Sequence, residues 1–85
     1  RVLFRSSPAR SDDDVTVSFS LKRSMALRLA AYNSAGMEID VLLEEHFPAG
    51  RHQTVFRTAG LPSGVYFLSL TAGTEQVVRR MILAR

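Results

Sequence analysis

The chain has 85 residues, which is room for one domain with one hydrophobic core. Hydrophobic residues make up 46% of it and charged residues 22%, the balance of an ordinary globular domain. It contains no run of about 18 apolar residues, which excludes a transmembrane helix. The absence of cysteine excludes a disulfide framework and a thiolate metal site. Because the chain begins with Arg1 and shows no signal-peptide pattern, we expect a piece of a longer protein or a processed product.

The net charge is +3, from 11 basic and 8 acidic residues. Domains that bind nucleic acid usually concentrate their basic residues on one face or stripe. Here the arginines are scattered singly, apart from Arg79-Arg80, and acidic residues lie among them. This distribution argues against nucleic acid and indicates a solvated surface with some attraction for anions.

Turn-forming residues divide the chain into short apolar runs. The five glycines and three prolines all fall between these runs. This pattern is typical of an all-β domain, in which Gly and Pro supply the turn conformations. Six or seven short strands in a chain of this length predict a two-sheet antiparallel sandwich of the immunoglobulin type.

The first long strand is expected over residues 15–21, where apolar and polar residues alternate without a fault, so that one face contacts the core. Residues 25–32 contain good helix formers and could form a helix, but their short length and the turn that follows favour a strand. All the expected strands, in chain order, are 2–5, 15–21, 25–32, 37–43, 52–57, 64–71 and 75–83.

Several connections follow from the residues between the strands. Asn33 is expected to begin a hairpin turn through its side chain, with Gly36 at positive φ. Residues 6–14 and 44–50 are predicted to be longer connections, and 72–74 the last hairpin turn. Charged residues such as Arg28 or Arg57 are expected to guard a sheet edge.

Residues 61–66 combine Pro62 and Gly64 with Tyr66 at the start of an apolar strand. This arrangement predicts a tyrosine corner, in which the Tyr hydroxyl bonds back to upstream backbone. We therefore expect Tyr66 to be largely buried.

No pattern in the sequence predicts catalysis, a cofactor or a metal site. The chain has two histidines, His46 and His52, and a zinc site needs three or four ligands in a fixed geometry. Asp12-Asp13-Asp14 lacks the spaced ligands and the Gly of a calcium loop, so we expect a solvated turn or linker. A catalytic set could be assembled from Ser, His52 and Asp, but such sets are recognised by geometry and not by composition. The sequence contains no nucleophile elbow and no phosphate-binding Gly loop.

An aromatic binding strip is the alternative to catalysis. The chain has no Trp, and most of its aromatic residues lie on apolar faces of the expected strands. Core packing is the better interpretation, with Tyr32 and Phe47 as the two side chains to examine for exposure.

Three motifs resemble one known family. They are Pro48-Ala49-Gly50-x-His52-x-x-x-Phe56, Leu61-Pro62-Ser63-Gly64-Val65-Tyr66-Phe67 and the basic-apolar ending Arg79-Arg80-Met81-Ile82-Leu83. In their order and spacing, the chain resembles the type A C-terminal sorting domain of proteins exported by the type IX secretion system of Bacteroidota. The likeness also covers residues 15–21 and the hairpin at 32–36, and spans roughly residues 8–85.

This resemblance implies a single domain over residues 1–85, a seven-stranded antiparallel immunoglobulin-like β-sandwich with residues 1–8 as a linker or opening strand. Such a domain carries an N-terminal passenger across the outer membrane of a Gram-negative bacterium through the type IX translocon. A sortase then removes it, here near residues 1–8, and links the passenger to anionic lipopolysaccharide. The residues that would belong to the signal are Gly64, Val65, Tyr66, Arg79, Arg80, Met81, Ile82 and Leu83.

The sequence departs from the family in two places. Members usually open with Asn-Pro pairs, where this chain has Ser7-Pro8, and their frequent Lys in the last strand is replaced by Arg79-Arg80. The similar immunoglobulin-like domain of flagellar hook-capping proteins has extra polar residues between positions equivalent to Phe56 and Leu61, which are missing here.

The alternative function is an immunoglobulin-like spacer, or a carbohydrate- or protein-binding module, of a secreted multidomain enzyme. A spacer should tolerate additions after the last strand, whereas a binding module should show an exposed aromatic or polar groove away from it. If the last strand is an exposed edge, weak pairing between two copies is a further expectation.

Overall fold

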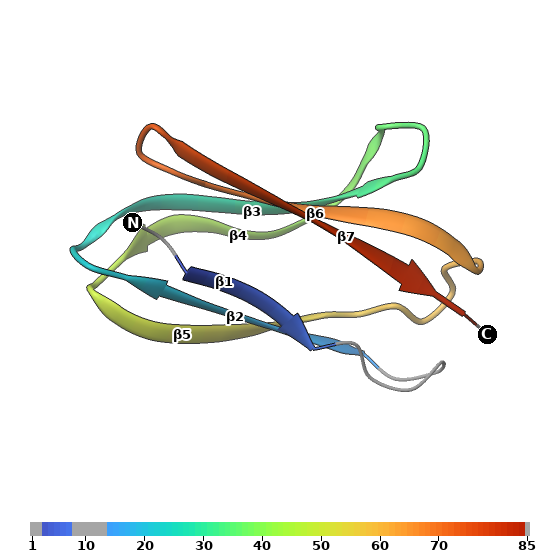
Figure 1. The fold of residues 1–85 in the computed structure, drawn as a ribbon, viewed down its shortest axis with the longest axis horizontal. Coiled ribbons are helices and arrows are strands. Elements are labelled where there is room, and N and C mark those ends of the chain that lie inside the picture. The colour runs from blue at the N-terminus through green and yellow to red at the C-terminus, as the bar shows by residue number, and fades with distance from the viewer. Residues whose placement is uncertain (1–2, 8–13, 85) are drawn as a thin grey trace.

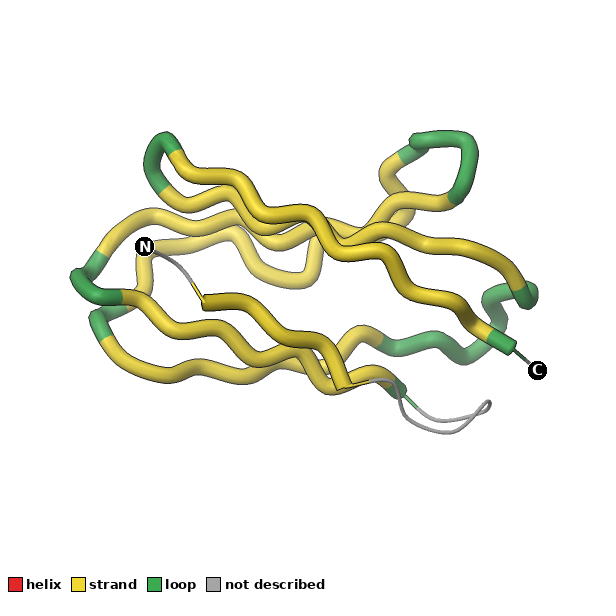
Figure 2. The backbone as a smooth tube through the Cα atoms, in the orientation of Figure 1, coloured by secondary structure: helices red, strands yellow, loops and turns green. Residues whose placement is uncertain are grey.

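The computed structural model describes residues 3–7 and 14–84, which form strands joined by short turns (Figures 1 and 2). The strands are β1 (Leu3–Ser7), β2 (Val15–Leu21), β3 (Met25–Asn33), β4 (Glu38–Phe47), β5 (Gly50–Phe56), β6 (Gly64–Ala72) and β7 (Glu75–Leu83). The described residues include no helix, and so none long and apolar enough to cross a membrane. The all-β prediction is confirmed.

The strands form two antiparallel sheets that face each other across one core (Figure 1). One sheet has the order β1-β2-β5 and the other the order β4-β3-β6-β7. Both sheets contribute apolar side chains to the core between them. Its buried members are Phe4, Val15, Val17, Phe19, Leu21, Leu27, Leu29, Ala31, Phe56, Tyr66, Leu68, Leu70, Ala72, Met81 and Leu83.

The alternation predicted for residues 15–21 is confirmed in β2, whose side chains are buried and half-buried in turn. The strand is central in its sheet, between β1 and β5. Its inward side chains therefore meet the opposite sheet, while the outward ones face solvent.

Residues 25–32 form a strand, as predicted, and not a helix. As an inner strand, β3 pairs antiparallel with β4 on one side and β6 on the other, which satisfies its backbone groups in two ladders. Leu27 and Leu29 are buried in the core. The good helix propensity of the segment is thus overridden by tertiary packing.

Three expectations about connections and edges were wrong. Residues 44–47 belong to β4 rather than to a connection, so only Pro48 and Ala49 separate β4 from β5. The polar side chains of Glu44, Glu45 and His46 suit an edge strand with one face in solvent, and polarity alone does not distinguish such a strand from a loop. Arg28 does not guard an edge, because β3 lies inside its sheet, and Arg57 follows the end of β5.

The opening strand is also longer than predicted. It continues through Ser6 and Ser7, which pair with Val17 and Thr16 of β2. Val2 and residues 8–13, where the start of the strand and most of the predicted connection fall, lie outside the described residues.

The predicted turn after β3 is confirmed in detail. The Asn33 side-chain oxygen Oδ1 accepts the backbone N–H groups of Ala35 and Met37, each at 3.0 Å. Gly36 has φ of 82°, a conformation that costs glycine little and other residues more. This hairpin and that of β6–β7 project from the four-stranded sheet on the side away from the other sheet (Figure 1).

The loop between β5 and β6 crosses from one sheet to the other and is held at both ends. At its start, the Asp14 carboxylate accepts the backbone N–H of Thr58 at 3.2 Å and a hydrogen bond from Arg57 at 3.3 Å. At its end, the Tyr66 hydroxyl donates to the Pro62 carbonyl oxygen at 2.6 Å, with Tyr66 only 4% exposed. The tyrosine-corner prediction is therefore confirmed.

Replacing Tyr66 with Phe removes this hydroxyl and leaves the Pro62 carbonyl without its partner. We expect Tyr66→Phe to lower the free energy of unfolding by about 1–2 kcal/mol. The control is Tyr32→Phe, since the Tyr32 hydroxyl makes a longer exposed bond of 3.4 Å to Glu38 and its loss should cost less than about 0.5 kcal/mol. Urea unfolding measures both, and equal shifts of the two midpoints would contradict the corner's role.

Candidate functional site

The pairing of β6 with β7 brings together the two stretches of the predicted signal. The strands run antiparallel, with Gly64 opposite Leu83, Val65 opposite Ile82 and Tyr66 opposite Met81. The stretches are far apart in the sequence but neighbours at one end of the molecule. The remaining predicted residues, Arg79 and Arg80, lie on the same strand pair, opposite Leu68 and Phe67.

Three of the eight predicted residues have side chains that face the core. Tyr66 is 4% exposed, Met81 7% and Leu83 5%. Since successive residues of a strand point to opposite faces, these three lie on the inner side of the four-stranded sheet. Their packing in the core holds β6 and β7 against the other sheet.

The alternate positions of β6 and β7 lie on the outer side of the sheet, and they include the predicted residues Val65, Arg80 and Ile82. Val65 and Phe67 on β6 are half-buried, while Val78, Arg80 and Ile82 on β7 are exposed. We call these five residues the outer patch. Ile82 has 61% and Val78 49% of its surface exposed, which is high for large apolar residues.

Arg79 lies differently from its neighbour Arg80. Its guanidinium carbon is 6.0 Å from the centre of the Phe4 ring, a cation–π contact across the open side between β7 and β1. Its Nη1 also donates to the Val78 carbonyl oxygen at 3.3 Å. An inward-leaning arginine at an edge strand is one of the devices that keep sheet edges from pairing with each other.

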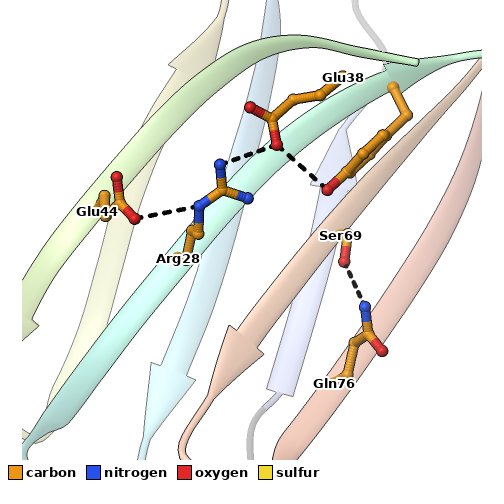
Figure 3. A network of polar contacts seen from close by, with 6 residues as sticks. Arg28, Glu38, Glu44, Ser69 and Gln76 are labelled. Atoms are coloured by element: carbon orange, nitrogen blue, oxygen red, sulfur yellow. Dashed lines mark hydrogen bonds and ion pairs between the residues drawn. The ribbon is translucent and has the colours of Figure 1, made fainter. Parts of the chain in front are cut away.

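A second arginine on the same outer face is neutralised by acidic residues (Figure 3). Arg28 donates from Nη2 to Glu38 at 2.8 Å and from Nε to Glu44 at 3.2 Å. The hydrogen bond with Glu38 raises the pKa of Arg28 above its already high ordinary value. Within the part of the chain that the structure describes, neither Arg79 nor Arg80 forms an ion pair with a carboxylate. The positive charges of Arg79 and Arg80 are therefore not balanced by a carboxylate of the described residues.

Small polar contacts fill the middle of this face. The Gln76 side-chain amide donates to the Ser69 hydroxyl at 3.0 Å, linking β7 to β6 (Figure 3). Ala30 and Ser69 lie opposite each other and are both buried by the larger side chains around them. Among the described residues, no strand or loop covers the outer face of this sheet.

The two histidines have structural contacts. His52 Nε2 donates to the Pro48 carbonyl oxygen at 2.8 Å, while its ring stacks on Phe19 and meets Phe47 edge-on, with centroids 5.3 and 5.1 Å apart. These contacts close the tight turn between β4 and β5. His46 Nε2 shares a hydrogen bond of 3.0 Å with the Ser24 hydroxyl. Sequence analysis missed both roles, although the four-residue spacing of Pro48 and His52 was visible in the motif.

The structure brings His46 near acidic residues, but not as a catalytic set. Together with Glu44 and Glu45 it lines a shallow hollow of about 430 Å³ on the outer face. Glu44 is bonded to Arg28, and among the described residues no carboxylate bonds to His46 to orient its ring. The same residues include no group of three or more potential metal ligands.

The aromatic residues chosen for examination are not a binding strip. Tyr32 is half-buried on the outer face beside Phe67, and Phe47 is half-buried with its ring 5.5 Å from that of Phe19. They lie on different elements, so the two rings do not form one platform.

Comparison with known proteins identifies the family. The chain matches the family model described as the secretion system C-terminal sorting domain over residues 8–84, nearly its whole length. A search of the curated proteins and a search of the solved structures each found no match. The matched range includes the whole β6–β7 pair and its outer patch.

Domains of this family are in general non-catalytic. Membership implies interaction with the type IX secretion machinery, attachment to a passenger, and a secreted or cell-surface location for the protein that carries the domain. On the match over residues 8–84, this chain belongs to the C-terminal sorting domains of the type IX secretion system.

Proposed function

We propose that this domain directs a larger N-terminal passenger across the outer membrane through the type IX translocon, for attachment to the cell surface or release. The observation that carries the proposal is the family match, which runs through β7 to residue 84. In this function the domain is not an enzyme and uses no cofactor. A sortase removes it near residues 1–8 once the passenger has crossed, in a Gram-negative bacterium of the Bacteroidota.

The geometry supports two different roles for the residues of the signal, one in folding and one in recognition. Tyr66, Met81 and Leu83 hold the strands in place from the core side, and the translocon does not contact them directly. The residues open to recognition are Gly64, Val65, Arg79, Arg80 and Ile82. All five lie on the β6–β7 pair: Gly64, Val65 and Ile82 at the end where β6 begins and β7 ends, and Arg79 and Arg80 in the middle of β7.

We also propose that the fold is an immunoglobulin-like sandwich of seven strands. Two features support it: the two facing antiparallel sheets and the tyrosine corner at the start of β6. In such a sandwich β7 pairs with β6, which holds the residues of the proposed signal in a sheet.

The cleavage expected near residues 1–8 has a structural constraint. Phe4 of β1 is buried in the core and lies under Arg79. A cut after β1 would remove this ring from the sandwich, whereas a cut before β1 would leave the domain intact. The proposed function therefore favours the upstream end of the expected range.

Export by a fused reporter tests the proposal. Residues 1–85 are joined to the C-terminus of a fluorescent protein that carries a signal peptide, in a Bacteroidota host, beside a fusion that lacks Arg79–Arg85. We expect fluorescence at the surface or in the medium from the first fusion only. Periplasmic retention of both, with the domain shown to be folded, would instead favour a spacer or binding module.

Single substitutions separate recognition from folding. Ile82→Asp should cost about 1 kcal/mol of stability or less, because the side chain is exposed, yet reduce export strongly. Met81→Asp should cost more than about 3 kcal/mol, because it buries a charge. Thermal unfolding and surface fluorescence measure the two effects.

The matched control is Val55→Asp. Val55 is an exposed valine on β5, an edge strand of the other sheet, and is 44% exposed. This variant should fold and be exported normally. Equal loss of export in Val55→Asp and Ile82→Asp would show that the outer patch has no special role.

A further inference from the structure

The free edge of β7 is the longest regular edge that the described residues leave open. β7 has nine residues and pairs with β6 along its whole length without a register shift. Its other side has no neighbouring strand in the described part of the chain, because β7 ends the order β4-β3-β6-β7. Such an edge presents backbone N–H and C=O groups that can pair with another strand, although the Val78 carbonyl already accepts a bond from the Arg79 side chain.

The remaining edges are less suited to this. β4, at the opposite side of the same sheet, pairs with β3 through two register shifts, and bulged edges resist further pairing. In the other sheet, β1 has five residues and β5 has seven. The β7 edge therefore offers the longest uninterrupted ladder.

The side chains of β7 define what can pair there. On the outer face, exposed Val78 and Ile82 flank Arg80, two residues away on each side. The order apolar, Arg80, apolar reads the same in both directions along the strand. A partner strand with a complementary order can therefore pair with it in a parallel or an antiparallel arrangement. The described residues offer no carboxylate to Arg80, which leaves its charge available to a partner.

A second copy of the chain is a poor partner for this edge. Antiparallel pairing of two full β7 strands in the centred register places Arg79 opposite the Arg79 of the other copy. Each Arg80 then lies one position from this pair of like charges. Like charges directly opposite each other destabilise a strand pair, so the arginines disfavour the self-pairing expected from the exposed edge.

We propose that the β7 edge binds an extended acidic segment of another protein, which adds a strand to the four-stranded sheet. Its carboxylate lies opposite Arg80, and apolar side chains two positions away on each side cover Val78 and Ile82. Backbone bonds supply affinity in this mode of recognition, and alternate side chains supply specificity. The identification of this partner with a component of the export machinery rests on the proposed function.

A synthetic peptide tests the edge directly. The probe has nine residues and blocked ends, with Glu at its fifth position, Val at its third and seventh, and Thr elsewhere. We expect saturable binding to the purified chain with Kd below about 1 mM, and amide chemical-shift changes concentrated in residues 77–82. A peptide with Lys in place of Glu should bind about threefold to thirtyfold more weakly, since attraction is replaced by repulsion.

A charge reversal distinguishes pairing at Arg80 from general electrostatics. Arg80→Glu should invert the preference, so that the Lys peptide binds more tightly than the Glu peptide. Arg51→Glu, which makes the same change at an exposed residue of the β5 edge, should leave the original preference unchanged. A misfolded variant would bind neither peptide and could not produce the inversion.

Three results would overturn the inference: no saturable binding at about 1 mM peptide, shift changes on another edge, or equal binding of both peptides to the unmodified chain. A dimer formed through β7 in sedimentation experiments would also overturn it. The peptide assay involves no export, so its failure beside normal export would leave the proposed function standing. Peptide binding beside failed export would overturn the proposed function alone.

Discussion

The antiparallel register of β6 and β7 is the constraint on which the candidate site depends. It places Val65 beside Ile82 and Tyr66 beside Met81, and so decides which side chains face the core. In a strand, a slip of one residue would exchange the buried and exposed sets completely. Burial of Met81 and Leu83 opposes such a slip, because a slipped strand would bring Arg80 and Ile82 inward instead.

In the proposed function, folding and recognition therefore use different residues of the same two strands. A motif such as Gly64-Val65-Tyr66 combines a turn residue, a half-exposed side chain and a buried anchor, and each position is constrained for a different reason. The hydroxyl of Tyr66 fixes the start of β6 on the Pro62 carbonyl, and β6 in turn positions β7. A change at a buried position would weaken the signal by loosening the strand pair, even where no partner touches it.

Local patterns predicted much of this fold, because they are determined by neighbours in the sequence. The alternation of residues 15–21, the Asn33 turn and the Tyr66 corner each follow from the spacing of a few residues. The errors arose where sheet order decides the outcome. Glu44, Glu45 and His46 are exposed polar residues of an edge strand, and the sequence alone does not reveal which strands become edges.

Long-range polar contacts were beyond sequence analysis for the same reason. Asp14 was expected to be part of a solvated turn, yet its carboxylate holds Thr58, 44 positions along the chain. Arg28 was expected at an edge, yet it joins two glutamates of β4 on the inner strand β3. For the candidate site, the sequence indicated the residues, but only the pairing of β6 and β7 showed that they lie on neighbouring strands.

Arginines that form ion pairs and arginines that do not explain how a domain with a small net charge can still have a local positive electrostatic potential. Arg28 is surrounded by Glu38 and Glu44, so its charge is balanced within a few ångströms. Arg79 and Arg80 are adjacent on an edge strand, and screening at physiological ionic strength acts over about 8 Å, farther than the spacing of neighbouring strands. A strand that pairs with β7 would therefore lie within the screening length of both charges. The same two residues can thus discourage contact between copies of the domain and favour an acidic partner, which an uncharged edge could not do.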